Sequence, residues 1–120
     1  MKNSVKALLL AAAFTSTGAL ADECNLGDMP TLPSGATASM EEMVAGQQAV
    51  KAFQAEAQTY RSCLDEEMNT IREAADDGDE TSAEAFKTLT DAYNASVAAE
   101  EEMANEFNAQ IREYKAANPS

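Results

Sequence analysis

Two long stretches that are almost free of Gly and Pro lie on either side of a single glycine, Gly78. Residues 40–75 contain one Gly and no Pro, and residues 82–117 contain neither. Both stretches are rich in Ala, Glu, Gln and Met, which favour helix, while the residues that interrupt helices are missing. The sequence therefore predicts two helices of about 36 residues, each ~54 Å long, joined by an acidic turn.

Local signals mark where these helices begin and end. Ser39 and Thr81 are each followed by Glu three residues later, and this spacing is typical of a capping box at a helix start. Gly78 can end the first helix because glycine readily adopts the left-handed conformation. We expect helices over about residues 40–75 and 82–117.

Apolar residues recur in both stretches at close to the heptad spacing of coiled coils. The expected rows are Met43, Val50, Ala57, Leu64, Ile71 and Gly46, Phe53, Tyr60, Glu67, Ala74 in the first helix, and Phe86, Tyr93, Glu100, Phe107, Tyr114 and Ala83, Thr90, Val97, Ala104, Ile111 in the second.

Folding the chain back at Gly78 brings these rows together in antiparallel order, from Ile71 with Phe86 near the turn to Met43 with Tyr114 at the open end. The predicted fold class is all-α, a long antiparallel two-helix hairpin that resembles a coiled coil. Two polar layers, Ala57 with Glu100 and Glu67 with Thr90, are expected to fix the register. The alternative is a pair of helices in a longer bundle. The contact between the two helices, here called the seam, is half exposed in a lone hairpin, which would allow a homodimer.

The N-terminus has the pattern of a secretory signal peptide over residues 1–21. Lys2 and Lys6 precede an apolar run of eight residues, and Ala19-Leu20-Ala21 gives a small-x-small cleavage site. The run is far shorter than the about 20 residues needed to cross a bilayer, although a short N-terminal anchor is an alternative. We expect cleavage between Ala21 and Asp22, a periplasmic or secreted protein, and no transmembrane segment in the mature chain.

The net charge disfavours two classes of partner, and the absence of His excludes two kinds of catalytic site. The chain has 21 acidic and 8 basic residues and a formal net charge of −13. Such a charge disfavours nucleic acids and anionic membrane surfaces but permits cations or cationic peptides. The chain has no His, so it contains neither a Ser-His-Asp nor a Cys-His site. We expect no enzyme activity, no catalytic residues and no cofactor.

Residues 22–38 contain several Gly and Pro and predict an extended arm. Cys24 in this arm and Cys63 in the first helix are the two cysteines of the expected exported chain, so a disulfide between them is the default. Cys63 lies ~36 Å along the helix, and the arm can span at most ~50 Å. The bridge therefore requires the arm to double back along the hairpin. A link between two chains and free redox thiols are the alternatives.

Two features suggest cation binding, each with a plainer interpretation. Met40 and Met43 are three residues apart on one helix face, and thioethers bind Cu(I), but methionines are also common in cores. The acidic runs at residues 65–67 and 100–102 are suited to divalent ions or cationic peptides, although a solvated helix face is the plainer explanation.

The segments Pro30-x-x-Pro33-x-Gly35, Met40-Glu41-Glu42-Met43 and Tyr60-x-x-Cys63-Leu64 resemble those of a group of small, uncharacterised exported proteins of Gram-negative bacteria. The resemblance covers roughly residues 24–67, implies periplasmic residence and an arm-plus-hairpin form, and carries no activity to transfer. We expect a non-enzymatic structural or protein-interaction module that presents an acidic helical surface to an unknown protein partner. The alternatives are a protein that handles copper or divalent cations, and a chaperone-like holdase.

Overall fold

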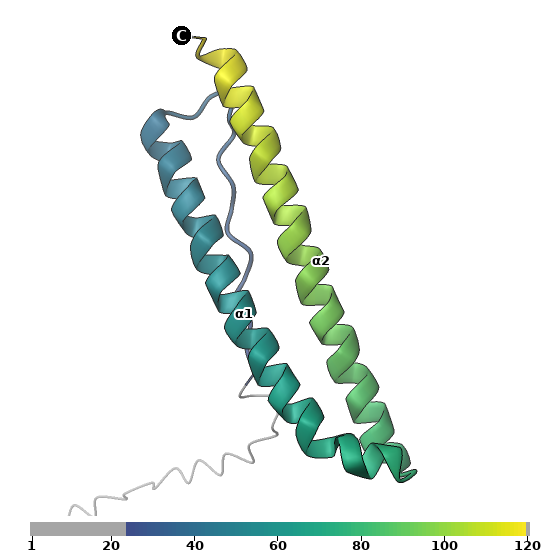
Figure 1. The fold of residues 1–120 in the computed structure, drawn as a ribbon. Helices are drawn as coiled ribbons and strands as arrows, with labels where there is room; N and C mark the ends of the chain where they lie inside the picture. Colours follow the sequence, from purple (N-terminus) through teal and green to yellow (C-terminus); the bar gives the residue numbers. More distant parts are fainter. Residues whose placement is uncertain (1–23, 120) are drawn as a thin grey trace, which may run out of the picture.

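The computed structural model describes residues 24–119, so the expected signal peptide lies outside the described residues. Two helices, α1 (Met40–Asp76) and α2 (Glu80–Ala117), pack along their lengths. Figure 1 shows that they run in opposite directions and that the N-terminal arm lies alongside both. The predicted all-α hairpin is confirmed.

Side-chain and backbone hydrogen bonds define both ends of α1. The Ser39 hydroxyl accepts a hydrogen bond from the backbone N–H of Glu42 at 3.1 Å, which confirms the predicted N-cap. At the other end Gly78 has a φ of 94°. The N–H groups of Gly78 and Asp79 donate to the carbonyls of Ala75 and Ala74, so the last carbonyls of α1 are satisfied as in a Schellman motif.

The predicted N-cap of α2, Thr81, is wrong by two residues. The helix begins at Glu80 with Asp79 as its N-cap, and the Asp79 carboxylate accepts a hydrogen bond from the Ser82 hydroxyl at 2.6 Å rather than from a backbone N–H. The reason is the short turn at Gly78. It reverses the chain so sharply that α2 begins at Glu80, only two residues after the glycine. Thr81 therefore lies inside the first turn of the helix.

The arm forms a third layer that contacts both helices. The backbone N–H of Gly35 donates to Oε1 of Gln110 on α2 at 2.8 Å, and a Cβ at Gly35 would overlap the backbone carbonyl of Gln110. On α1, a Cβ at Gly46 would lie 2.7 Å from Cδ of Pro33. The two glycines thus allow a close approach that any other residue would prevent, and the expectation that the arm doubles back is confirmed.

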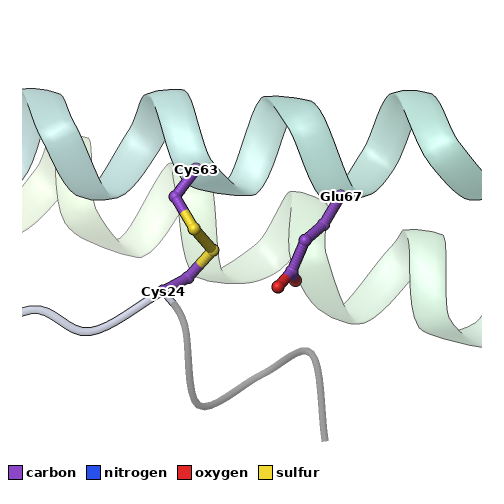
Figure 2. Close-up of side chains that lie close together, drawn as sticks. All are labelled: Cys24, Cys63 and Glu67. Atoms are coloured by element: carbon purple, nitrogen blue, oxygen red, sulfur yellow. A yellow bond between two sulfur atoms is a disulfide. The ribbon is translucent and has the colours of Figure 1, made fainter. Parts of the chain in front are cut away.

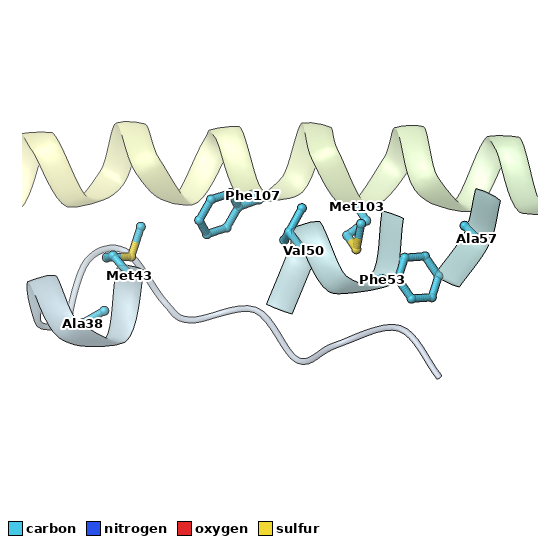
Figure 3. Close-up of a cluster of buried hydrophobic side chains, with 7 residues drawn as sticks. All are labelled: Ala38, Met43, Val50, Phe53, Ala57, Met103 and Phe107. Atoms are coloured by element: carbon cyan, nitrogen blue, oxygen red, sulfur yellow. The ribbon is translucent and has the colours of Figure 1, made fainter. Parts of the chain in front are cut away.

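Two apolar clusters fill the molecule. The open-end cluster, drawn in Figure 3, consists of Ala38, Met43, Val50, Phe53, Ala57, Met103 and Phe107. The turn-end cluster consists of Cys24, Leu64 and Met68, with half-buried Tyr60, Cys63, Phe86, Leu89, Ala92 and Tyr93 packed against it. The predicted rows of α1 supply most of its buried positions, whereas Ala74, near the turn, is exposed.

The predicted seam of α2 is rotated from the observed one. The row that begins at Ala83 was expected to be buried, but Ala83 is exposed and the later members of that row are only half-buried. Ser96 and Met103 are buried instead, with 3% and 2% of their surface exposed. Both lie at heptad spacing from Gln110, which holds the arm. Because the arm covers one side of the helix pair, α2 turns that side inward.

Candidate functional site

An apolar groove opens between the start of α1 and the end of α2. It has a volume of about 350 Å³ and is lined by Met40, Met43, Val44, Gln47, Phe107, Ile111, Tyr114 and Lys115. We call it the open-end groove.

The floor and the rim of this groove differ in exposure. Met43 and Phe107 in the floor belong to the open-end cluster and are 6% and 7% exposed. At the rim, Met40 is 60% exposed and Val44 is 44% exposed, although both side chains are large and apolar. Contiguous exposed apolar surface of this kind marks binding sites in soluble proteins.

A separate hollow lies nearer the middle of the hairpin. It is lined by Gln54, Val97, Glu100, Glu101 and Ala104.

Its walls follow the same helix faces as the open-end groove, because Gln54 lies seven residues after Gln47 and Ala104 lies seven residues before Ile111. No residue of the arm lines either hollow. The side of the helix pair away from the arm is therefore apolar at the open end and polar with acidic groups in the middle.

A polar layer crosses the seam between the two apolar clusters. Arg61 forms an ion pair with Glu100 at 2.8 Å and donates a hydrogen bond to the Ser96 hydroxyl at 3.1 Å. The Arg61 and Glu100 side chains are 14% and 21% exposed. A polar layer at Glu100 was predicted, but its partner is Arg61 rather than Ala57, which is fully buried. A search for a base one helical turn from Ala57 would have found Arg61.

The predicted disulfide is confirmed, and it lies within one chain. Cys24 is bonded to Cys63, with the two Cα atoms 5.5 Å apart. Figure 2 shows the Glu67 carboxylate, one turn further along α1, directed toward the bridge. The carboxylate and both sulfur atoms lie within 4.8 Å of one another.

The predicted polar layer of Glu67 with Thr90 is not observed. The Thr90 hydroxyl donates instead to the Phe86 carbonyl at 2.9 Å and contacts Sδ of Met68 at 3.5 Å. A threonine hydroxyl in a helix reaches the carbonyl four residues back within its own element, and the contact that Thr90 makes with the facing helix is with Met68 rather than Glu67.

The residues singled out for cation binding are divided between core and surface. Met43 is buried in the open-end cluster, and Met40 is exposed at the groove rim. Each acidic run turns one carboxylate inward, Glu67 toward the disulfide and Glu100 toward Arg61. The other acids of these runs are exposed, so neither run forms a continuous acidic patch.

Comparison of the chain with models of known protein families, with curated proteins and with solved structures finds no significant match. The resemblance to small exported proteins stays a prediction. Within residues 24–119, neither helix has an apolar stretch sufficient to cross a membrane.

Proposed function

We propose that this protein is a non-enzymatic interaction module, exported to the periplasm or secreted, that holds one segment of a partner protein in the open-end groove. The observation that carries the proposal is the exposure of Met40 and Val44 directly beside the buried floor formed by Met43 and Phe107. Export is supported by the signal pattern of residues 1–21 and by the disulfide, which is typical of oxidising compartments.

The partner segment that suits this groove is an amphipathic helix with basic residues beside its apolar face. A groove between two antiparallel helices accepts the apolar stripe of a third helix. The net charge of −13 attracts a cationic segment from a distance. Exposed Glu101, in the separate hollow nearer the middle of the hairpin, provides an acidic contact once the segment has docked. The acidic surface thus recruits the partner, and the apolar groove holds it.

A binding role also agrees with the side chains that the chain offers. It contains no His to act as a general base near neutral pH. Its cysteines are joined in a structural bridge. Most of the groove lining is apolar, apart from Gln47, Lys115 and the hydroxyl of Tyr114. Such a lining binds apolar groups and offers no nucleophile paired with a base.

A model peptide tests the proposal. The probe is a labelled helical peptide with Leu at positions i, i+3, i+4 and i+7 and Lys on its flanks, and fluorescence anisotropy measures its affinity. We expect Val44→Asp to weaken binding at least ten-fold, because it places a charge in the apolar rim. The matched control is Ala45→Asp, an exposed position on α1 that does not line the groove, which should bind as the natural protein does.

Two outcomes would contradict the proposal. One is equal affinity for a scrambled peptide of the same composition, which would reduce the interaction to charge alone. The other is equal binding by the Val44→Asp and Ala45→Asp proteins, which would place the peptide elsewhere. Sedimentation of the protein alone then shows whether a second copy occupies the groove as a homodimer.

A chaperone-like holdase is a second candidate, favoured by the two methionines in the groove. Met40 and Met43 have flexible, unbranched side chains that adapt to many apolar partners. A holdase would suppress the aggregation of an unfolded client protein, and Val44→Asp would reduce that suppression. If a molar excess of the protein does not suppress aggregation, the holdase candidate is discarded. The peptide assay still tests binding to a specific partner.

A further inference from the structure

We propose that reduction of the Cys24–Cys63 disulfide creates a Zn²⁺ site whose protein ligands are the two cysteine thiolates and the Glu67 carboxylate. The two sulfur atoms and a Glu67 carboxylate oxygen lie within 4.8 Å of one another in the closed, disulfide-bonded form. This site lies on the arm side of α1 and does not involve the open-end groove, so the inference is independent of the proposed binding function.

The fold brings these three groups together from two directions. Cys63 and Glu67 are four residues apart on α1, so their side chains share one helix face. Cys24 reaches them because the arm runs back along the helices from its attachment at Ser39. Figure 2 shows the bridge and the carboxylate on the same side of α1, with the Glu67 oxygens turned toward the sulfurs.

Glu67 has an oxygen that the rest of the described protein leaves unsatisfied. Oε1 of Glu67 is buried and has no hydrogen-bond partner among residues 24–119. Buried polar atoms are nearly always paired, and an unpaired carboxylate oxygen is especially unfavourable. Arg61, a base elsewhere on α1, is already engaged by Glu100 and Ser96. In the reduced chain, a cation held between Glu67 and the two thiolates would supply the missing partner.

The ligand set matches Zn²⁺ better than other common metals. Zn²⁺ binds thiolates at ~2.3 Å and carboxylates at ~2.0 Å in tetrahedral geometry. Two thiolates and one carboxylate fill three positions, and water fills the fourth. A soft ion such as Cu(I) has less use for the carboxylate, while Mg²⁺ and Ca²⁺ do not select thiolates. The sulfurs must separate after reduction, and Cys24 can move because it lies in the extended arm rather than in a helix.

The chemistry balances with a dithiol as the reductant. A thiolate of the dithiol attacks one sulfur of the bridge, the Cys24–Cys63 bond breaks, and a mixed disulfide forms. The second thiol of the reductant resolves it, so the dithiol becomes a disulfide and the protein gains two electrons and two protons as two thiols. Zn²⁺ then displaces both thiol protons and binds the thiolates together with Glu67.

Cobalt substitution tests the site. The purified protein is reduced with a phosphine, separated from it without oxygen, and titrated with Co²⁺, whose thiolate charge-transfer absorption reports sulfur ligation. Zn²⁺ is then added to displace Co²⁺. We expect one Co²⁺ per reduced chain, none per oxidised chain, and full displacement by Zn²⁺. Glu67→Gln should weaken Co²⁺ binding at least ten-fold, and Cys24→Ser should abolish the absorption band.

The matched control is Glu66→Gln, the exposed neighbour on α1, which should bind as the natural protein does. Circular dichroism monitors helicity throughout. The proposal would be overturned by a reduced chain that shows no charge-transfer band. Equal affinity of the Glu67→Gln and Glu66→Gln proteins would overturn it as well, and so would a loss of helicity on reduction that Zn²⁺ does not restore.

Discussion

Arg61 lies in the polar layer between the two apolar clusters, although it belongs to neither predicted row of α1. Its guanidinium pairs with Glu100 and with the buried hydroxyl of Ser96. Both side chains are largely buried, so each charge needs the other as its partner, because water screens neither of them well. An exposed ion pair such as Lys87 with Asp91, whose side chains are 79% and 63% exposed, contributes far less. The same type of contact thus has two different energies in one molecule.

Replacing Glu100 tests this difference. Glu100→Ala leaves Arg61 half-buried without its partner, so we expect the free energy of unfolding to fall by about 2–3 kcal/mol. The control Asp91→Ala should change it by less than about 0.5 kcal/mol. Urea unfolding followed by circular dichroism measures both. Equal effects of the two substitutions would show that burial does not strengthen the Arg61 pair.

At the scale of the element, the two helices begin differently although the sequence around Ser39 and Thr81 shows the same spacing. Ser39 caps α1 with its side chain, whereas Thr81 lies inside α2 and is exposed. The difference comes from what precedes each helix. Ser39 follows the arm and has room for an extended cap, while the glycine turn at Gly78 leaves only Asp79 before α2 begins.

Alanine at these two positions should have opposite effects. Ser39→Ala removes the hydrogen bond to the Glu42 N–H, and we expect a loss of about 1 kcal/mol of stability. Thr81→Ala should leave stability unchanged or raise it by up to about 0.7 kcal/mol, because alanine is the better helix former. Thermal melting of the two variants gives the comparison. A loss at Thr81 as large as that at Ser39 would restore Thr81 as the cap.

At the scale of the whole molecule, the arm makes the hairpin asymmetric. It covers one side of the helix pair, where Gly35 and Pro33 approach Gln110 and Gly46. The other side keeps its half-buried row and forms the groove. The arm is held at both ends, by its connection to α1 at Ser39 and by the disulfide at Cys24. The hairpin therefore has one covered side and one open side.

Removing the bridge should loosen this arrangement without destroying the helices. The disulfide closes a loop with a sequence separation of 39 residues. We expect the double variant Cys24→Ser, Cys63→Ser to lose roughly 3–4 kcal/mol of stability while keeping its helical circular dichroism. Denaturant midpoints measure the loss, and intact mass after alkylation verifies the bridge in the natural protein. Unchanged midpoints would mean that the bridge does not constrain the unfolded chain.

The sequence predicted the structure correctly where residues close in sequence decide it. Two helices, the glycine at Gly78 and the α1 cap at Ser39 follow from propensity and capping. The α1 rows follow from heptad spacing. The disulfide followed from cysteine count and chain reach. Predictions about Glu67, Glu100 and the α2 face were wrong or incomplete, because each depends on a neighbour distant in sequence.

By itself, the sequence determined an acidic, helical hairpin with an arm and two cysteines that can meet, since these properties depend on composition and on contacts along one segment. Only the tertiary structure decided which side of α2 is buried, because the arm packs against Gln110, and Ser96 and Met103 at heptad spacing from it are buried as well. The same packing left the opposite side open as a groove and directed Glu67 toward the bridge. Both candidate sites exist because three segments, rather than two, pack against one another.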